Sequence, residues 1–144
     1  MRILAVDPGE KRIGLAISDP TGIIANPLTV LQHSARAIDA ASIAQLAAEH
    51  EAGQIIVGAS YDEEGQLTPQ GRRAERLAQA IAAQTELPVA LWDEAGSTQA
   101  ARRASIELGV PARKRRQQGH GHLDEIAATY ILQTYLDAQR HRSI

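Results

Sequence analysis

The chain has 144 residues, 44% of them hydrophobic and 22% charged, and its net charge of −2 gives no reason by itself to expect a polyanionic partner. It contains no cysteine, which excludes disulfides, thiolate zinc sites and cysteine nucleophiles. No apolar run approaches the roughly 18 residues of a membrane span, and the chain begins on a predicted strand without a signal-like leader, so we expect a cytoplasmic protein with no membrane partner.

The opening segment predicts a β-hairpin. Residues 3–6 are all apolar, Pro8 and Gly9 supply a turn, and apolar and small residues alternate over residues 13–18. Asp7 is a carboxylate at the end of a strand that is expected to be buried on both faces, where it is costly to desolvate without a positive neighbour. Two interpretations remain open here: a bound cation beside Asp7, or an aspartate that only caps the turn.

The next segment predicts a third strand and a helix. Residues 23–31 form the strand, on which Pro27 indicates an edge position or a bulge. Ser34 is a candidate N-cap for a helix over residues 35–50, with Ile38 on its apolar face.

The second half of the chain predicts strands that alternate with helices. The continuously apolar residues 54–58 are typical of a central parallel strand, and Thr68-Pro69 is a helix start signal. The remaining elements are a strand over residues 89–92, a helix from Ser97 or Thr98 to about Leu108, and a last helix over about residues 123–139. This β-β-β-α-β-α-β-α-α order predicts one α/β domain over residues 1–144, with helices flanking a five-stranded mixed sheet.

Acidic residues lie where ligands collect in open α/β sheets, beyond the carboxyl ends of strands. Asp7 follows the first strand, Asp93 and Glu94 follow the fifth, and Asp124 lies in the first turn of the last helix, on its apolar face. The helix N-terminus alone would account for Asp124, since it favours an anion. Together, however, carboxylates from three segments suit Mg²⁺ or Mn²⁺. Two such ions about 4 Å apart would clamp the attacking and leaving oxygens of a phosphodiester displacement.

Positive charge is concentrated in one segment. Residues 102–116 hold six basic residues and one acid, a charge of +5 that leaves −7 for the rest of the chain. Its densest run, Arg113, Lys114, Arg115 and Arg116, shortly precedes Asp124, so we expect it to reach the same edge of the molecule. It is a candidate contact for a phosphate backbone, and a solvated polar loop is the alternative.

These segments resemble a known family. Residues 7–19, Asp-Pro-Gly-Glu-Lys-Arg-Ile-Gly-Leu-Ala-Ile-Ser-Asp, are similar to the DxGxKRxGxAxSD signature of the YqgF/RuvX family. Residues 88–94 resemble its PVxxWDER segment and residues 124–137 its DxxAAxxILQxYLD ending. That family belongs to the ribonuclease H-like superfamily and includes proteins named as Holliday junction resolvases and as nucleases that process pre-16S ribosomal RNA. The resemblance covers nearly the whole chain and implies a ribonuclease H-like fold, in agreement with the strand order.

The resemblance implies a hydrolase, an Mg²⁺- or Mn²⁺-dependent endonuclease in which Asp7, Glu94 and Asp124 are the catalytic, metal-binding acids. The residues expected to contact nucleic acid are Lys11, Arg12, Ser97, Thr98, Arg113, Lys114, Arg115 and Arg116. The expected function is processing of the 5′ end of pre-16S rRNA in ribosome biogenesis. The alternative is resolution of four-way DNA junctions, which predicts a homodimer because a junction resolvase needs two active sites.

Residues 95–96 depart from the family pattern, because Ala-Gly stands where Arg-Leu is usual. The loss of that arginine removes a phosphate contact and supports a second alternative, a binding module that grips RNA with a weakened site. An ATPase lobe is a third hypothesis, but such enzymes need two lobes, and the chain has no second Asp-x-Gly. The choice between Asp93 and Glu94 as ligand remains open, and His120 and His122 are interpreted as surface residues.

Overall fold

The computed structural model describes residues 1–95 and 120–142, except for the side chains of residues 120–123, 125 and 142. Its strands are β1 (Arg2–Pro8), β2 (Arg12–Ser18), β3 (Ala25–Gln32), β4 (Ala52–Ala59) and β5 (Val89–Asp93). Its helices are α1 (Arg36–Glu49), α2 (Pro69–Ala82) and α5 (His120–Arg142). The helix predicted over residues 97–108 lies outside the described residues. No helix in the described part of the chain is long and apolar enough to cross a membrane.

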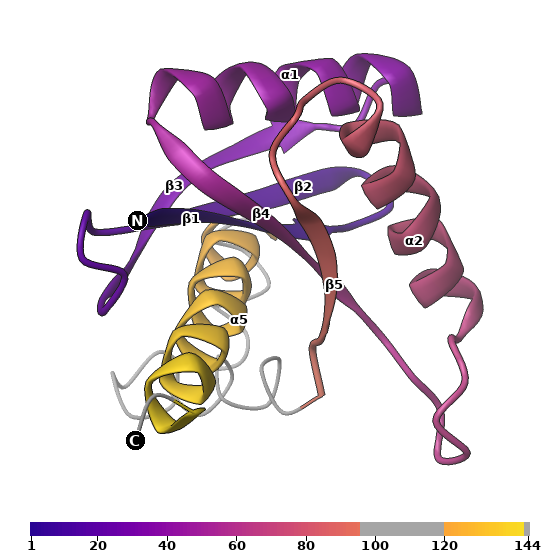
Figure 1. Ribbon diagram of the computed structural model, residues 1–144. Helices are drawn as coiled ribbons and strands as arrows, with labels where there is room; N and C mark the ends of the chain where they lie inside the picture. Colours follow the sequence, from indigo (N-terminus) through magenta and orange to yellow (C-terminus); the bar gives the residue numbers. More distant parts are fainter. Residues whose placement is uncertain (96–119, 143–144) are drawn as a thin grey trace.

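The five strands form one mixed sheet in the order β3-β2-β1-β4-β5 (Figure 1). β1, β2 and β3 are an antiparallel meander, whereas β4 and β5 run parallel to β1. The carboxyl ends of β1, β4 and β5 therefore lie at the same edge of the sheet. This arrangement confirms the predicted mixed sheet, with β4 inserted between the two strands that precede the acids.

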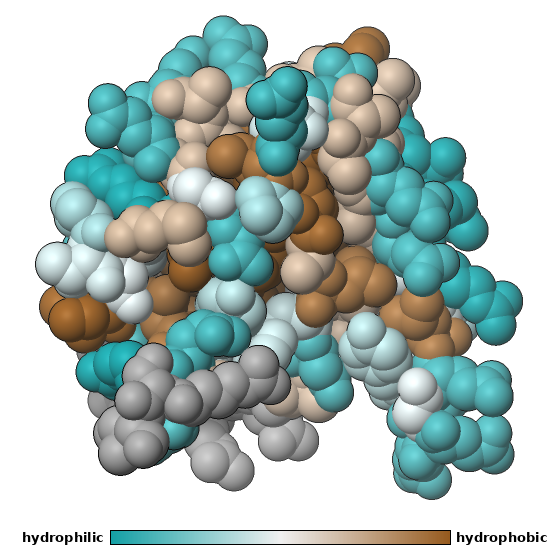
Figure 2. Space-filling view, viewed as in Figure 1, coloured by the Kyte–Doolittle hydropathy of each residue, from teal (hydrophilic) through white to brown (hydrophobic). Residues whose placement is uncertain are grey.

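Helices cover both faces of the sheet, with α1 and α2 on one face and α5 on the other (Figure 1). The alternation predicted for β2 sorts its side chains accordingly. Ile13, Leu15 and Ile17 belong to the core under α1 and α2, and Ala16 belongs to the core under α5. Figure 2 shows polar residues along the outer side of α2 and hydrophobic residues in the middle of the same view. We refer to the two sides as the α1/α2 face and the α5 face.

The start and the buried side of α1 differ from the prediction. Ala35, not Ser34, occupies the N-cap position, and no side chain caps the helix there. Ile38, predicted to be on the apolar face, is 57% exposed. The buried residues of α1 are Asp39, Ala40, Ile43 and Ala47. Asp39 is buried because the Nδ1 atom of His33 and the backbone N–H of Ser34 bond its two carboxylate oxygens, a pairing that hydropathy does not reveal.

The other boundaries agree with the sequence to within a few residues, except at the last helix. The hydroxyl of Thr68 accepts the N–H of Gly71 at 3.0 Å, and Pro69 opens α2, as predicted. α5 begins three residues before the predicted range of 123–139 and ends three residues after it. It packs on β1, β2 and β3 on the α5 face.

Candidate functional site

The three predicted acids lie at one edge of the sheet. In β1, Ile3 and Ala5 face α5, so the alternation of side chains along a strand places Asp7 on the same face. In the same way Trp92 faces α5, and Glu94 lies two residues beyond it. Asp124 comes from α5, but not from its first turn as predicted, because the helix already begins at His120. The geometry therefore collects one acid from each of three separate segments.

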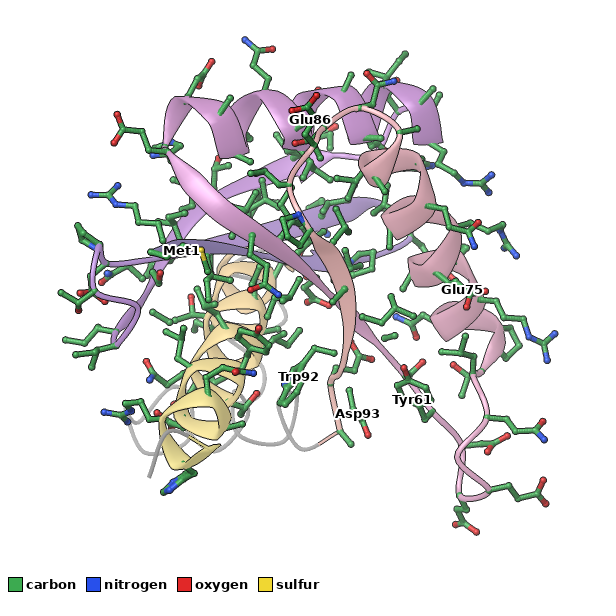
Figure 3. The ribbon with its side chains drawn as sticks, viewed as in Figure 1. Met1, Tyr61, Glu75, Glu86, Trp92 and Asp93 are labelled. Atoms are coloured by element: carbon green, nitrogen blue, oxygen red, sulfur yellow. The ribbon has the colours of Figure 1, made fainter. Side chains whose placement is uncertain are left out.

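Contacts of Trp92 fix the end of β5 against α5. Its indole N–H donates to the Thr134 hydroxyl at 3.0 Å, and its ring meets Tyr135 edge to face at 5.1 Å. Figure 3 shows Trp92 between β5 and α5, with Asp93 at the end of the strand. These contacts set the position from which Glu94 extends.

Glu94, not Asp93, is the acid of this pair that lies near Asp7. Asp93 is exposed, and its carboxylate accepts the N–H of Ala95 at 2.8 Å, which forms a local turn. Glu94 is half-buried, and its charge acts directly on Asp7. Of the two acids, Glu94 is therefore the one beside Asp7, and its role as the ligand stays a prediction.

The carboxyl of Asp7 is in an unfavourable environment for a negative charge. Burial, and then the charges of Glu94 and Asp124, raise its pKa from 3.8 to about 7. Burial and the neighbouring charge of Asp93 also raise the pKa of Glu94. Three carboxylates at one edge repel one another unless a proton or a cation reduces their charge.

Arg12 lies beside Asp124. Its Nε atom is 3.4 Å from Oδ2 of Asp124, and both side chains are half-buried. The two residues border a shallow depression of about 360 Å³ that Gly9, Glu10 and Lys11 also line. Lys11 and Arg12, predicted from the family resemblance to contact phosphates, thus lie beside one of the acids.

Two glycines allow the acids to approach one another, and the sequence did not single them out. Gly14 on β2 pairs with Asp7, and a Cβ atom built on it would lie 2.2 Å from the carbonyl oxygen of Asp124. A Cβ atom on Gly58 would lie 2.7 Å from the Cδ1 atom of Ile131 and 3.6 Å from the Oε2 atom of Glu94. The small residues that alternate along β2 were the available signal for Gly14, because they mark the face that accepts a closely packed helix.

The donor chemistry of this edge fits a hard divalent cation, since all three groups are carboxylates. The half-buried carboxyl of Asp7, beside two other acids, gives such an ion a favourable place to bind. Among the residues that the structure describes, however, no group of three or more histidine or acidic side chains lies close enough together to hold a metal ion. Asp124 is instead paired with Arg12. Asp7, Glu94 and Asp124 therefore stay a predicted set of metal ligands.

The other predicted contacts with nucleic acid fall in the undescribed part of the chain. Ser97, Thr98 and the basic run at residues 113–116 lie between β5 and α5, within residues 96–119. Ala95 is described and exposed, whereas Gly96 belongs to the same undescribed segment.

Comparisons with known proteins agree on one family. A family model described as "RuvX: Holliday junction resolvase" matches residues 1–138. A protein of Thermoanaerobacter pseudethanolicus named "Putative pre-16S rRNA nuclease" is 39% identical over 142 residues, which cover 99% of this chain and all of the relative. A protein of Myxococcus xanthus with the same name is 35% identical, with 97% of this chain and 90% of the relative covered.

Solved structures show the same fold at low sequence identity. Thermus thermophilus RuvC, solved with a Holliday junction substrate, superposes with a TM-score of 0.59 at 15% identity, covering 98% of this chain and 96% of that one. The fowlpox virus resolvase with Holliday junction DNA gives a TM-score of 0.53 at 15% identity, covering 96% and 99%. The predicted ribonuclease H-like fold is confirmed.

Proposed function

The chain belongs to the RuvX family of Holliday junction resolvases, and from that premise we propose that it is a metal-dependent endonuclease that processes the 5′ end of pre-16S rRNA. The names of its relatives support this substrate. The observation that carries the proposal is the meeting of Asp7, Glu94 and Asp124 at one edge of the sheet, where the pKa of Asp7 is raised to about 7. In this proposal residues 1–144 form a single nuclease domain.

Asp7, Glu94 and Asp124 would hold the cation or cations, Mg²⁺ or Mn²⁺. Two bound ions would lower the pKa of the attacking water and offset the charge that develops on the reacting phosphate. The protein's own contribution is to hold the three carboxylates at one edge, where Arg12 pairs with Asp124 and the pKa of Asp7 stays raised. With a pKa of about 7, Asp7 is partly protonated at neutral pH when no cation is bound. A positive charge beside it favours the ionised form that binds metal.

Lys11 and Arg12 would hold the substrate phosphate next to the acids. Both border the depression beside Asp124, and a guanidinium group can bond two phosphate oxygens at once. Arg12 is within reach of both Asp124 and a phosphate in that depression, so it orients the backbone of the substrate relative to the acids. The basic run at residues 113–116 is proposed to extend this contact.

Resolution of four-way DNA junctions is the second candidate, and the description of the matching family favours it. This activity requires two active sites that cut symmetrically. It therefore predicts a homodimer of this chain, and a strict monomer would argue for the RNA substrate.

The test compares cleavage of a pre-16S rRNA fragment and of a four-way DNA junction in Mg²⁺ or Mn²⁺. We expect Asp7→Asn to lower the cleavage rate about a hundredfold or more, because it removes a ligand worth several kcal/mol in the transition state. Asp93→Asn is the matched control: it neutralises a neighbouring exposed acid and should cut at nearly the rate of the wild type. A wild-type rate in Asp7→Asn contradicts the assignment. Salt-sensitive RNA binding without cleavage by the wild type would indicate the binding module instead.

A further inference from the structure

Besides the depression next to Asp124, the structure has a hollow on the α1/α2 face. The turn of the β1–β2 hairpin separates this hollow from the acids. It has a volume of about 200 Å³. Pro8, Ile13 and Leu77 give it an apolar lining, and His33, Arg36 and Arg73 add polar and positive groups. Figure 1 shows how the start of α1, the middle of α2 and the turn after β1 meet in this region. The hollow thus combines an apolar wall with two arginines, and two acids, Glu10 and Asp39, line it as well.

The two arginines of the hollow are available to an anion. Arg36 is exposed and forms no ion pair within the described ranges. Arg73 is 3.6 Å from Glu10, whose side chain is 81% exposed. An exposed pair of this length contributes little, so Arg73 can exchange Glu10 for a phosphate at small cost.

His33 adds an aromatic ring with a fixed orientation. Its Nδ1 atom bonds the buried carboxylate of Asp39, while the side chain remains 44% exposed. Because Asp39 also accepts the N–H of Ser34, both of its oxygens are engaged by donors and do not face the hollow as free acceptors. A positioned imidazole ring is a surface on which an unstacked base can stack.

The hollow and the site of the acids are joined by two residues. Gly9 and Glu10 line both the hollow and the depression that holds Arg12 and Asp124. A polynucleotide in contact with both must therefore bend around the end of a single hairpin. A DNA duplex has a persistence length of about 150 base pairs, so a sharp bend around the hairpin costs elastic energy, whereas a single strand bends readily.

We propose that this hollow binds one unpaired nucleotide of the substrate strand, next to the phosphate that is cleaved. Arg36 and Arg73 hold its phosphate, and the ring of His33 and the apolar wall receive its base. This inference rests on the proposed nuclease function and deepens it. It assigns to the enzyme a substrate that is single-stranded on one side of the cleavage site.

The test measures binding in the Asp7→Asn background, so that the RNA stays intact. The probes are a single-stranded RNA from the 5′ region of pre-16S rRNA and the same sequence in a fully paired duplex. The variants are Arg36→Gln with Arg73→Gln, and the control is Arg72→Gln, an exposed arginine that precedes Arg73 on α2 and does not line the hollow.

We expect the double variant to bind single-stranded RNA about tenfold or more weakly at 0.1 M salt, and its salt dependence to fall by about 1.4 in slope, as two lost phosphate contacts of about 0.7 each require. Binding of the duplex and of the Arg72→Gln control should change little. Glu10→Gln should tighten binding of the single strand, because it removes the competitor for Arg73.

Equal losses for the double variant and the control, or equal losses for the single strand and the duplex, would overturn the subsite. That result would leave the nuclease proposal intact if Asp7→Asn still abolishes cleavage. Conversely, a selective loss of single-strand binding in a protein that cuts nothing would support the subsite and defeat the proposed function. Unchanged thermal unfolding of the double variant shows that the effect is not misfolding.

Discussion

The two faces of the sheet treat a desolvated carboxylate in opposite ways. On the α1/α2 face, Asp39 is 4% exposed, and both of its oxygens accept hydrogen bonds. On the α5 face, Asp7 is desolvated beside the charges of Glu94 and Asp124, and its pKa rises to about 7. The first arrangement stabilises the fold. The second keeps electrostatic repulsion between carboxylates, which destabilises the fold. Such an arrangement is expected of a functional site.

Truncation on the α1/α2 face should cost stability and spare catalysis. Ile43 is fully buried between α1 and the sheet, so Ile43→Ala should lower the free energy of unfolding by about 2–5 kcal/mol. Urea unfolding measures this change. Below the unfolding transition the rate of cleavage should stay near that of the wild type, and a parallel fall in rate would show that the two faces are not separable.

Neutralising Asp7 should stabilise the fold although it abolishes cleavage, the opposite of the effect expected for Ile43→Ala. A raised pKa means that the native state binds the proton more tightly than the unfolded chain does, so the penalty of Asp7 grows as pH rises from about 4 to about 7. Without divalent cations, Asp7→Asn should therefore be more stable than the wild type at pH 8, by at most about 4 kcal/mol. The advantage should shrink toward pH 4. Unfolding curves at several pH values measure it, and an advantage independent of pH would contradict the assigned environment.

Gly14→Ala tests whether the position of α5 matters for catalysis beyond its effect on stability. The new methyl group would meet the backbone carbonyl of Asp124, which must move away from β2 and so shifts the Asp124 carboxylate. We expect a loss of about 1–3 kcal/mol in stability and about tenfold or more in the cleavage rate. Gly65→Ala is the control: Gly65 has a φ of +81° and open space around it, so it should lose about 1 kcal/mol without loss of activity.

The sequence reveals the acids because each stands at a recognisable boundary. Asp7 and Glu94 follow apolar strands, and Asp124 lies near the start of a helix, so the rule that ligands collect beyond strand ends brings them together. Thr68 and Pro69 located α2 by the same kind of local signal.

What the sequence did not reveal depends on contacts between distant segments or across a turn. The burial of Asp39 involves His33, which lies outside the helix and bonds its carboxylate. The need for Gly14 appears only once α5 is packed on β2. No sequence periodicity or motif predicts either contact.

The most direct test of the central claim is the pKa of the Asp7 carboxyl, measured by NMR in the absence and presence of Mg²⁺. We expect a value of about 7 without the ion, a lower value in Glu94→Gln and Asp124→Asn, which remove neighbouring charge, and a marked fall when Mg²⁺ is added. An ordinary value near 4, unaffected by Mg²⁺ and by both substitutions, would contradict the assignment of this edge as a cation-dependent catalytic site.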